Sequence, residues 1–336
     1  MQSDETILQN PVRWGILSAA NIGVNHVAPA IHASSNGSLV AVGSRNPDRA
    51  RALFAFAPEI AVYDNYESVI NDPAIEAIYN PLPNSLHAEW TIRALQAGKH
   101  VLCEKPLAVT AEQGAMMAQV SRETGNLLME AFMYRFHPQT VWVLEQIANG
   151  RIGDVKLVHS SFSFNISSRP RDIRLRAALA GGSLMDVGCY PINVCRAIYG
   201  RMPLAVGARV FVPDESEVER SANAVLDFGN GCFGLIDCSF DLPARQVTEI
   251  IGDAGTITIR VPFSSIHTEA TVLVSTEGQE VDQHFAPFDQ YRLEVEHFAA
   301  CIRLARFPIL SLEETIENLA TIEAIYQSAG YSWPRA

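Results

Sequence analysis

The first 130 residues alternate short apolar runs with longer amphipathic segments, and this rhythm constrains the fold more than any other feature. Helix-length segments separate the runs, with Asn84 or Ser85 and Thr110 as candidate N-caps. Short buried strands joined by such helices predict a doubly wound parallel sheet. Pro29 falls inside the first helical pattern, so it should kink that helix or mark a late start. The expected strands are Val12–Leu17, Leu39–Gly43, Ile75–Tyr79, His100–Cys103 and Asn126–Met129, and the expected helices include Pro47–Phe56, Ser85–Ala97 and Thr110–Glu123.

After about Phe132 the pattern changes to alternating apolar and polar residues separated by turn residues. Gly229–Gly231 lies between two strand patterns and predicts a hairpin turn. The chain should therefore divide into an α/β domain (1–132) and an α+β domain (133–336) with a large, mostly antiparallel open sheet. The expected strands are 155–166, 206–212, 223–228, 232–240, 247–251, 256–261 and 271–275; the expected helices are Asp186–Tyr199, Asp289–Leu304 and Glu313–Ser328, the last packing back on the first domain.

Charge and composition exclude several classes of partner. The formal net charge is -12, which repels phosphate backbones and anionic headgroups, so neither nucleic acid nor membrane is an expected partner. No apolar stretch approaches the roughly 18 residues that span a bilayer, and Met1–Asn10 lacks the features of a secretory signal. The six cysteines form no CxxC pair and no zinc-type spacing with histidine, which predicts reduced thiols, no metal site and a cytoplasmic location.

The first strand runs into a loop that has the position of a dinucleotide-binding fingerprint. The strand contains Gly15, and the G-x-G-x-x-G pattern would then require glycines at 18, 20 and 23, of which only Gly23 is present. Ser18 and Ala20 are small enough to let a pyrophosphate approach the helix that starts near Asn21 and Ile22. The loop alone is a weak signal, because a strand–turn–helix with small residues is common.

The end of the second strand indicates which dinucleotide would bind. NAD sites usually carry Asp or Glu there, about 20 residues after the loop, to accept hydrogen bonds from the ribose 2′-hydroxyl. Here Ser44 and Arg45 stand at that position and Arg49 follows. A serine and two arginines can donate to a 2′-phosphate that a carboxylate would repel, so the sequence favours NADP.

Five motifs stand in order along the chain: Trp14–Ser18, Pro81–His87, Glu104-Lys105-Pro106, Glu130–Pro138 and Gly181–Tyr190. Together they resemble the glucose–fructose oxidoreductase/inositol dehydrogenase (Gfo/Idh/MocA) family. They keep the family's order and spacing over most of the chain, and the similarity is greatest to the branch of NADP-dependent D-xylose dehydrogenases, dihydrodiol dehydrogenases and glucose–fructose oxidoreductase. The resemblance implies a Rossmann domain followed by an α+β substrate domain.

The resemblance also implies roles for individual residues. Many members have histidine four residues after the aspartate that corresponds to Asp186; here Tyr190 stands there, as is usual in the named branch, where it is taken as the catalytic acid/base. Lys105 is the cation expected to favour the Tyr190 phenolate, and Asp186 is expected to hold sugar hydroxyls or orient Lys105. Pro81, Asn84, His87, Glu104 and Lys105 carry over as cofactor-binding positions, with His87 on the nicotinamide side.

The function expected is oxidation of an aldopyranose at C1 to the lactone, with NADP⁺ as hydride acceptor. Oxidation of a trans-dihydrodiol, sugar–sugar oxidoreduction on a retained cofactor, and a non-enzymatic NADP-binding regulator remain alternatives. The four arginines from Arg169 to Arg176 leave a phosphorylated sugar open as substrate. A sheet with one face free of helices can pair with a second copy, so a homodimer or homotetramer through the second domain is expected.

Overall fold

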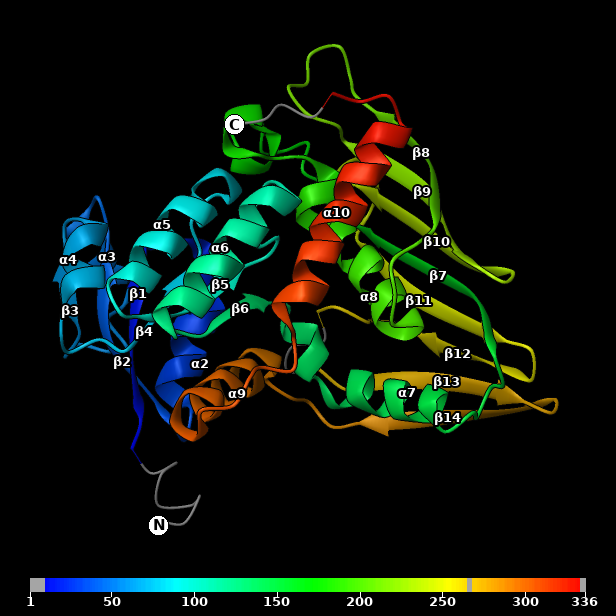
Figure 1. Cartoon of the computed structure of the whole chain (residues 1–336), viewed down its shortest axis with the longest axis horizontal. Coiled ribbons are helices and arrows are strands. Elements are labelled where there is room, and N and C mark those ends of the chain that lie inside the picture. Colours follow the sequence, from blue (N-terminus) through cyan, green and yellow to red (C-terminus); the bar gives the residue numbers. More distant parts are fainter. Residues whose placement is uncertain (1–9, 265–267, 333–336) are drawn as a thin grey trace. The chain divides into compact units, whose positions relative to one another are not determined.

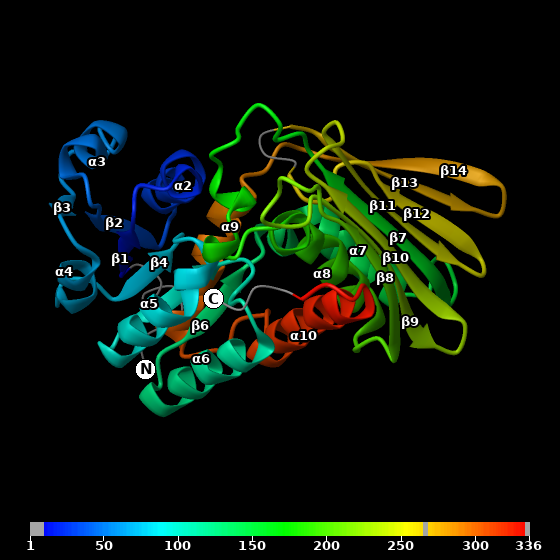
Figure 2. The ribbon, with the colours of Figure 1, turned by 90° about the horizontal axis from the view of Figure 1, so that it is seen from above.

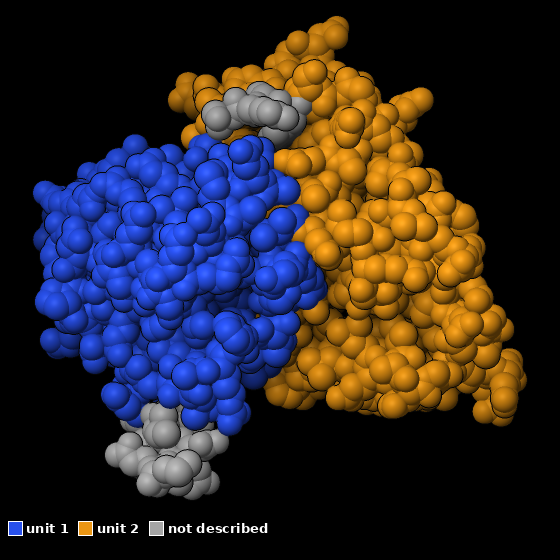
Figure 3. Space-filling model, viewed as in Figure 1, with its two compact units in different colours: residues 1–133, 289–316 blue, residues 134–288, 317–336 orange. Residues whose placement is uncertain are grey.

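The computed structural model describes residues 10–264 and 268–332, which form two compact units (Figure 1). The first unit comprises 1–133 and 289–316, and the second comprises 134–288 and 317–336 (Figure 3). The sequence predicted one domain boundary, after residue 132. The structure assigns a later segment, 289–316, to the first unit as well.

The first unit contains a six-stranded sheet in which every pair is parallel. Its order is β3-β2-β1-β4-β5-β6, so the chain starts in the middle of the sheet and winds outward in both directions. This order confirms the predicted doubly wound fold and puts the switch point, where such sheets bind ligands, between β1 and β4. The strands are β1 (Val12–Leu17), β2 (Gly37–Gly43), β3 (Ala61–Tyr63), β4 (Ala77–Asn80), β5 (His100–Glu104) and β6 (Leu128–Ala131).

Helices cover both faces of this sheet because the strands are apolar on both sides (Figure 2). α5 and α6 pack together on one face, and α2 and α9 pack together on the other. Pro29 does mark a late start: a π-helical turn comes first, and Pro29 then lies in the first turn of α2, where its missing N–H costs least. The helices are η1 (Gly23–Val27), α2 (Ala28–Ala33), α3 (Pro47–Leu53), α4 (Tyr66–Asn71), α5 (Asn84–Gln96), α6 (Ala111–Thr124) and α9 (Gln290–Leu304).

The second unit contains an eight-stranded sheet in the order β14-β13-β12-β11-β7-β10-β9-β8. Only β7 and β10 pair in parallel, so the predicted mostly antiparallel sheet is confirmed. The predicted turn after β9 is a two-residue hairpin in which Asn230 and Gly231 both have positive φ. The strands are β7 (Val155–Ser163), β8 (Ala205–Phe211), β9 (Ser221–Gly229), β10 (Cys232–Ser239), β11 (Arg245–Gly252), β12 (Gly255–Ile259), β13 (Ala270–Thr276) and β14 (Gln279–Phe285).

The helices of this unit lie against one face of its sheet. α8 packs on β7 and β10, and α7 packs on β13. Side chains at alternate positions point toward these helices and form the core, which includes Val158, Leu226, Ile236 and Ile250. The remaining helical segments are η2 (Met133–Phe136), α7 (Pro138–Ala148), η3 (Ile173–Leu175), η4 (Ala177–Leu179), η5 (Leu184–Gly188), α8 (Cys189–Tyr199) and α10 (Leu312–Ser328), of which α10 begins in the first unit.

Candidate active site

The cofactor-binding positions predicted in the first unit follow the carboxyl ends of four parallel strands. Because these strands run in one direction, their following loops lie along the same edge of the sheet. Pro81 lies at this edge beside the helix that follows the first loop, since a Cβ at Gly23 would lie 3.6 Å from its ring. The predicted positions lie at Ser18–Ile22 after β1, Ser44–Arg49 after β2, Pro81–Asn84 after β4, and Glu104–Lys105 at the end of β5.

The loop after β1 makes the tight turn that a dinucleotide site requires, although it lacks two of the usual glycines. Ser18 has a φ of 89°, a conformation in which glycine is common and other residues are rare. The backbone N–H of Ser18 donates to the carbonyl of Gly43 at 2.8 Å, and its hydroxyl accepts from the N–H of Ala20 at 3.3 Å. The chain becomes helical at Asn21, so free N–H groups of a helix start follow the turn directly.

Gly15 has a packing role that the sequence did not indicate. A Cβ at this position would lie 2.8 Å from side-chain carbons of Val69 and Ile75. The glycine therefore lets α4 and its following loop approach β1 closely. Gly15 thus has a packing role, and its place in the cofactor site stays a prediction.

The loop after β2 presents donors and no carboxylate between Gly43 and Pro47. The Ser44 hydroxyl accepts from the N–H of Asn46 at 3.2 Å, and the Asn46 side chain caps α3 by accepting from the N–H of Arg49 at 3.0 Å. The side chains of Arg45 and Arg49 are exposed. This arrangement fits a 2′-phosphate, because two exposed arginines follow Ser44 at the strand end.

The turn after β5 carries Lys105 and is held by carboxylates on both sides. Glu104 accepts a hydrogen bond from the buried Tyr79 hydroxyl at 2.6 Å, and the N–H of Leu107 donates to Glu130 at 2.8 Å. Lys105 is partly exposed, whereas Glu104 and the residues that follow Lys105 are buried. The lysine is thus the one position of the turn from Glu104 to Leu107 that combines a charge with access to solvent.

His87 braces this turn instead of facing a ligand. Its ring is completely buried, with Nδ1 2.9 Å from the carbonyl oxygen of Pro106 and Nε2 2.7 Å from that of Leu82. Burial lowers the pKa of His87 to about 4, even though the two carbonyls favour the protonated ring. A neutral ring can donate to only one of them. His87 therefore links the Pro81–Asn84 loop to the lysine turn as a neutral ring. Its place on the nicotinamide side stays a prediction.

In the second unit, Asp186 and Tyr190 lie on one helical segment, but its first turn is not α-helical. The sequence predicted an α-helix over Asp186–Tyr199. The structure has a π-helical turn, η5, over Leu184–Gly188 and an α-helix, α8, only from Cys189. Such turns are frequent at functional sites, and the wider turn changes how the two side chains are spaced around the helix.

Tyr190 lies among aromatic rings and has 5% of its surface exposed. The ring centroids of Phe263, Phe162 and Tyr134 are 5.3, 5.5 and 6.0 Å from that of Tyr190. The three neighbours come from different segments, with Phe162 on β7 and Tyr134 on η2. Packing on this scale fixes the orientation of the phenol.

Asp186 has a cationic partner within its own unit. The Arg174 Nε donates to Asp186 Oδ2 at 2.7 Å, and Arg174 Nη1 donates to Asp172 Oδ1 at 3.2 Å. The sequence expected Asp186 to hold sugar hydroxyls or Lys105, and it placed Arg174 in a basic cluster. That cluster is divided in the structure: Arg176 pairs with Glu217, while Arg169 and Arg171 are exposed.

The start of this helical segment is anchored by Glu219, a completely buried residue that precedes β9. Its carboxyl accepts from the N–H of Leu184 at 2.8 Å and from the hydroxyl of Tyr326 on α10 at 3.1 Å. Gly182 has a φ of 112°, and a Cβ there would lie 2.4 Å from the Glu219 carboxyl. The glycine therefore gives Glu219 the space to reach the helix start.

Two family models match the chain. One, described as an oxidoreductase family with an NAD-binding Rossmann fold, matches residues 12–132, and the other, the GFO/IDH/MocA C-terminal domain, matches residues 141–258. The chain belongs to the Gfo/Idh/MocA oxidoreductase family. The resemblance seen in the sequence motifs is thereby confirmed.

Individual Gfo/Idh/MocA members match over nearly the whole chain. D-xylose 1-dehydrogenase (NADP(+)) 2 of Haloferax volcanii is 39% identical, over 94% of this chain and 97% of its own. Trans-1,2-dihydrobenzene-1,2-diol dehydrogenase of Xenopus tropicalis is 27% identical, over 96% of this chain and 99% of its own. The crystal structure of KijD10, a 3-ketoreductase from Actinomadura kijaniata in complex with NADP and TDP-benzene, matches with a TM-score of 0.89 and 29% identity, over 95% of this chain and 98% of its own.

Sequence reasoning missed several residues that shape this Gfo/Idh/MocA site. Phe162 could be placed on the inner face of its strand by alternation, but not beside Tyr190, because no local pattern reports a contact between distant segments. The hydrogen bonds from Arg174 to Asp186 and from the Leu184 N–H to Glu219 could not be predicted for the same reason. Within the described residues, no helix is long and apolar enough to cross a membrane, and no cluster of three or more His, Cys, Asp or Glu side chains could hold a metal ion.

Proposed function

We propose that this protein is an NADP-dependent dehydrogenase that oxidises an aldopyranose at C1 to the lactone. The observation that carries this proposal is the 39% identity to a D-xylose 1-dehydrogenase (NADP(+)) along almost the full length of both chains. The exposed side chains of Arg45 and Arg49, which follow Ser44 in the chain, support NADP over NAD. Lys105, Asp186 and Tyr190, which the chemistry requires, are all present.

Each of these residues has a part in alcohol oxidation. NADP⁺, when bound, accepts the hydride. Tyr190 takes the hydroxyl proton as general base, which requires a phenol more acidic than the usual pKa of about 10. A positive charge favours the phenolate, and Lys105 supplies that charge. Asp186 accepts hydrogen bonds from the hydroxyls of the sugar and so holds the ring in place.

The test is a substrate panel. Purified protein is incubated with NADP⁺ or NAD⁺ and with pentoses, hexoses and diols while absorbance is followed at 340 nm, and lactone is trapped with hydroxylamine. Reduction of NADP⁺ by an aldose with matching lactone formation supports the proposal. Reduction without lactone, or no reduction by any aldose, contradicts it. Binding of NADP⁺ with no turnover on the whole panel would favour a regulator.

A trans-dihydrodiol dehydrogenase is the second candidate. The partly exposed ring of Phe162 beside Tyr190 suits a cyclic, unsaturated diol. Relatives with this activity match over nearly the full chain. A third, sugar–sugar oxidoreduction, is favoured by an aldose–aldose oxidoreductase structure from Caulobacter crescentus, with a TM-score of 0.88 and 27% identity. In that case NADP would copurify with the protein, and one aldose would be reduced as another is oxidised.

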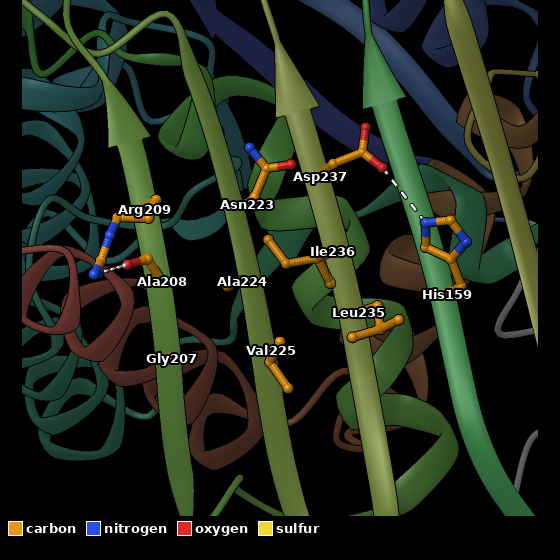
Figure 4. Close-up of a pocket in the computed structure, with 10 residues that line it drawn as sticks. All are labelled: His159, Gly207, Ala208, Arg209, Asn223, Ala224, Val225, Leu235, Ile236 and Asp237. Atoms are coloured by element: carbon orange, nitrogen blue, oxygen red, sulfur yellow. Dashed lines mark hydrogen bonds and ion pairs between the residues drawn. The ribbon is translucent and has the colours of Figure 1, made fainter.

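We also propose that copies of this chain associate through the outer face of the eight-stranded sheet. This face has a hollow of about 590 Å³, lined by side chains of β7, β8, β9 and β10 (Figure 4). Apolar Val225 and Leu235 point out of the sheet there among polar Arg209, Asn223 and Asp237. The described helices of this unit lie on the other face of the sheet. A surface of mixed apolar and polar side chains on the open face suits a second copy of the same sheet.

A further inference from the structure

Arg174 joins two acidic side chains that the sequence separates by fourteen positions. Its Nε lies 2.7 Å from Asp186 Oδ2, and its Nη1 lies 3.2 Å from Asp172 Oδ1. Both carboxylates are largely buried, whereas the arginine is partly exposed. Asp186 raises the pKa of Arg174 further above its usual value, so the guanidinium is charged at every pH at which the protein is folded.

The backbone of Arg174 is also held in place, by the Gly181-Gly182 turn. The N–H of Gly182 donates to the Arg174 carbonyl at 2.8 Å, and a Cβ on Gly181 would lie 2.3 Å from the same oxygen. The Gly181-Gly182 turn therefore packs against Arg174 just before the helical segment that carries Asp186 begins. A guanidinium fixed at this point can hold a carboxylate in one orientation without movement of the backbone.

We propose that Arg174 is a positioning residue that fixes the Asp186 carboxylate for a neutral, hydroxyl-rich substrate. The proposal rests on the proposed function, in which Asp186 binds sugar hydroxyls. Because Arg174 holds one oxygen of Asp186, it sets the orientation in which this carboxylate meets the substrate. Two carboxylates surround one guanidinium, so the group has a net negative charge. This charge disfavours a phosphorylated sugar, which the arginine-rich sequence had left open.

A double-mutant cycle tests whether Arg174 acts through Asp186. Arg174→Met should lower kcat/KM for the sugar by about 10- to 100-fold, the range of a charge-assisted hydrogen bond. NADP⁺ affinity, measured by fluorescence quenching, should change less than about twofold. In an Asp186→Asn background the same Arg174→Met change should have little further effect, since residues that act as a unit are not additive. Arg174→Lys, which keeps a charge, serves if the methionine variant does not fold.

Arg176→Met is the matched control, because it removes the same charge from the same segment and breaks an exposed pair with Glu217. Its kcat/KM should stay close to that of the parent. If Arg174→Met and Asp186→Asn have additive effects, or if Arg174→Met changes kcat/KM no more than the control does, Arg174 does not position Asp186. If Asp186→Asn itself leaves turnover intact, the proposed role of Asp186 fails instead.

The charge argument has its own test. Glucose and glucose 6-phosphate, or xylose and its 5-phosphate, are compared at one ionic strength with the unmodified protein. The phosphorylated form should be the poorer substrate by at least about tenfold in kcat/KM, as expected for one unfavourable charge contact. An equal or better kcat/KM for the phosphorylated sugar would contradict the inference about substrate class.

Discussion

The hydroxyl of Tyr190 can be removed with little effect on packing, because its ring is held by Phe162, Phe263 and Tyr134. Tyr190→Phe should therefore fold normally, while turnover falls by about 10²- to 10⁴-fold, the usual contribution of general acid–base catalysis. The dependence of the rate on pH should also disappear. Tyr199→Phe is a suitable control, since Tyr199 lies on the same helix and donates its hydroxyl to the Phe233 carbonyl at 2.9 Å. If Tyr190→Phe keeps the parent pH–rate profile, Tyr190 is not the base.

Lys105 is the charged, partly exposed residue of a turn whose neighbours are buried. Lys105→Met should reduce kcat by about 10²-fold or more, in the range seen when a group that stabilises a developing oxyanion is lost. Because Glu104, Glu130 and His87 hold the turn, the melting temperature should stay within a few degrees of the parent value. Stopped-flow and steady-state rates with a saturating aldose measure the effect. Turnover close to that of the parent would remove Lys105 from the mechanism.

Arg45 and Ser44 decide the preference between NADP⁺ and NAD⁺ if the assignment of the loop after β2 is right. Arg45→Asp should weaken NADP⁺ by about 10- to 100-fold, because a repulsion replaces a charge-assisted hydrogen bond of about 1.5–3 kcal/mol. NAD⁺ should be affected much less. Arg51→Asp, with the same charge change on α3, should have little effect on either cofactor. Equal efficiencies with the two cofactors in the unmodified protein would contradict the assignment.

Among secondary-structure elements, the helical segment with Asp186 and Tyr190 depends on a carboxyl that is neutral in the folded state. Burial raises the pKa of Glu219 to about 8 from its usual 4.5. Between these values the folded protein keeps a proton that the unfolded chain releases. A rise in pH through this window therefore favours unfolding, and the loss of stability levels off above about pH 8.

Glu219→Gln should remove this dependence. Glutamine keeps the oxygen that accepts from the Leu184 N–H and cannot ionise. The melting temperature of the variant should fall less than that of the parent between pH 5 and pH 8, and Glu217→Gln, an exposed neighbour, should leave the parent curve unchanged. Parallel curves for the parent and Glu219→Gln would show that the carboxyl does not titrate in this range.

The elements with a clear hydrophobic period could be predicted from the sequence, and the short or irregular ones could not. β1 was predicted at its observed bounds, Val12–Leu17, because both ends are marked by a change in polarity. β3 is three residues long, too short for any period to be seen. β14 has mostly exposed, polar side chains, because it is the edge strand of its sheet, and it therefore lacks an apolar alternation. α7 begins at Pro138 and was not predicted either.

The candidate site divides in the same way. The positions at strand ends, such as Lys105 and Arg45, could be predicted because parallel strands bring their carboxyl ends to one edge. The packing role of Gly15 and the bracing role of His87 could not be predicted, because both depend on neighbours from other parts of the chain. These are Val69 and Ile75 for the glycine, and two loop carbonyls for the histidine. Motif position alone does not distinguish packing from ligand binding.

For the molecule as a whole, association through the eight-stranded sheet predicts that the protein in solution has the mass of an oligomer. Val225 and Phe233 are exposed on the outer face of neighbouring strands. Replacing both with arginine should shift the protein toward the monomer in size-exclusion chromatography with light scattering, because charged groups would be buried at the interface. Phe307→Arg, at an exposed site of the first unit, should not change the mass. A parent protein that is already monomeric at micromolar concentration would contradict the proposed interface.

Because residues 289–316 belong to the first unit, this unit cannot complete its core until late in translation. α9 packs Phe298 against Trp14 and pairs Arg303 with Glu76, so the nucleotide-binding unit lacks part of its core until residues near 303 have left the exit tunnel. At a synthesis rate of about 5–20 residues per second, the apolar surface that α9 covers stays exposed on the nascent first unit for roughly 8–30 s. During translation, therefore, chaperones have their longest access to the part of the chain that is made first.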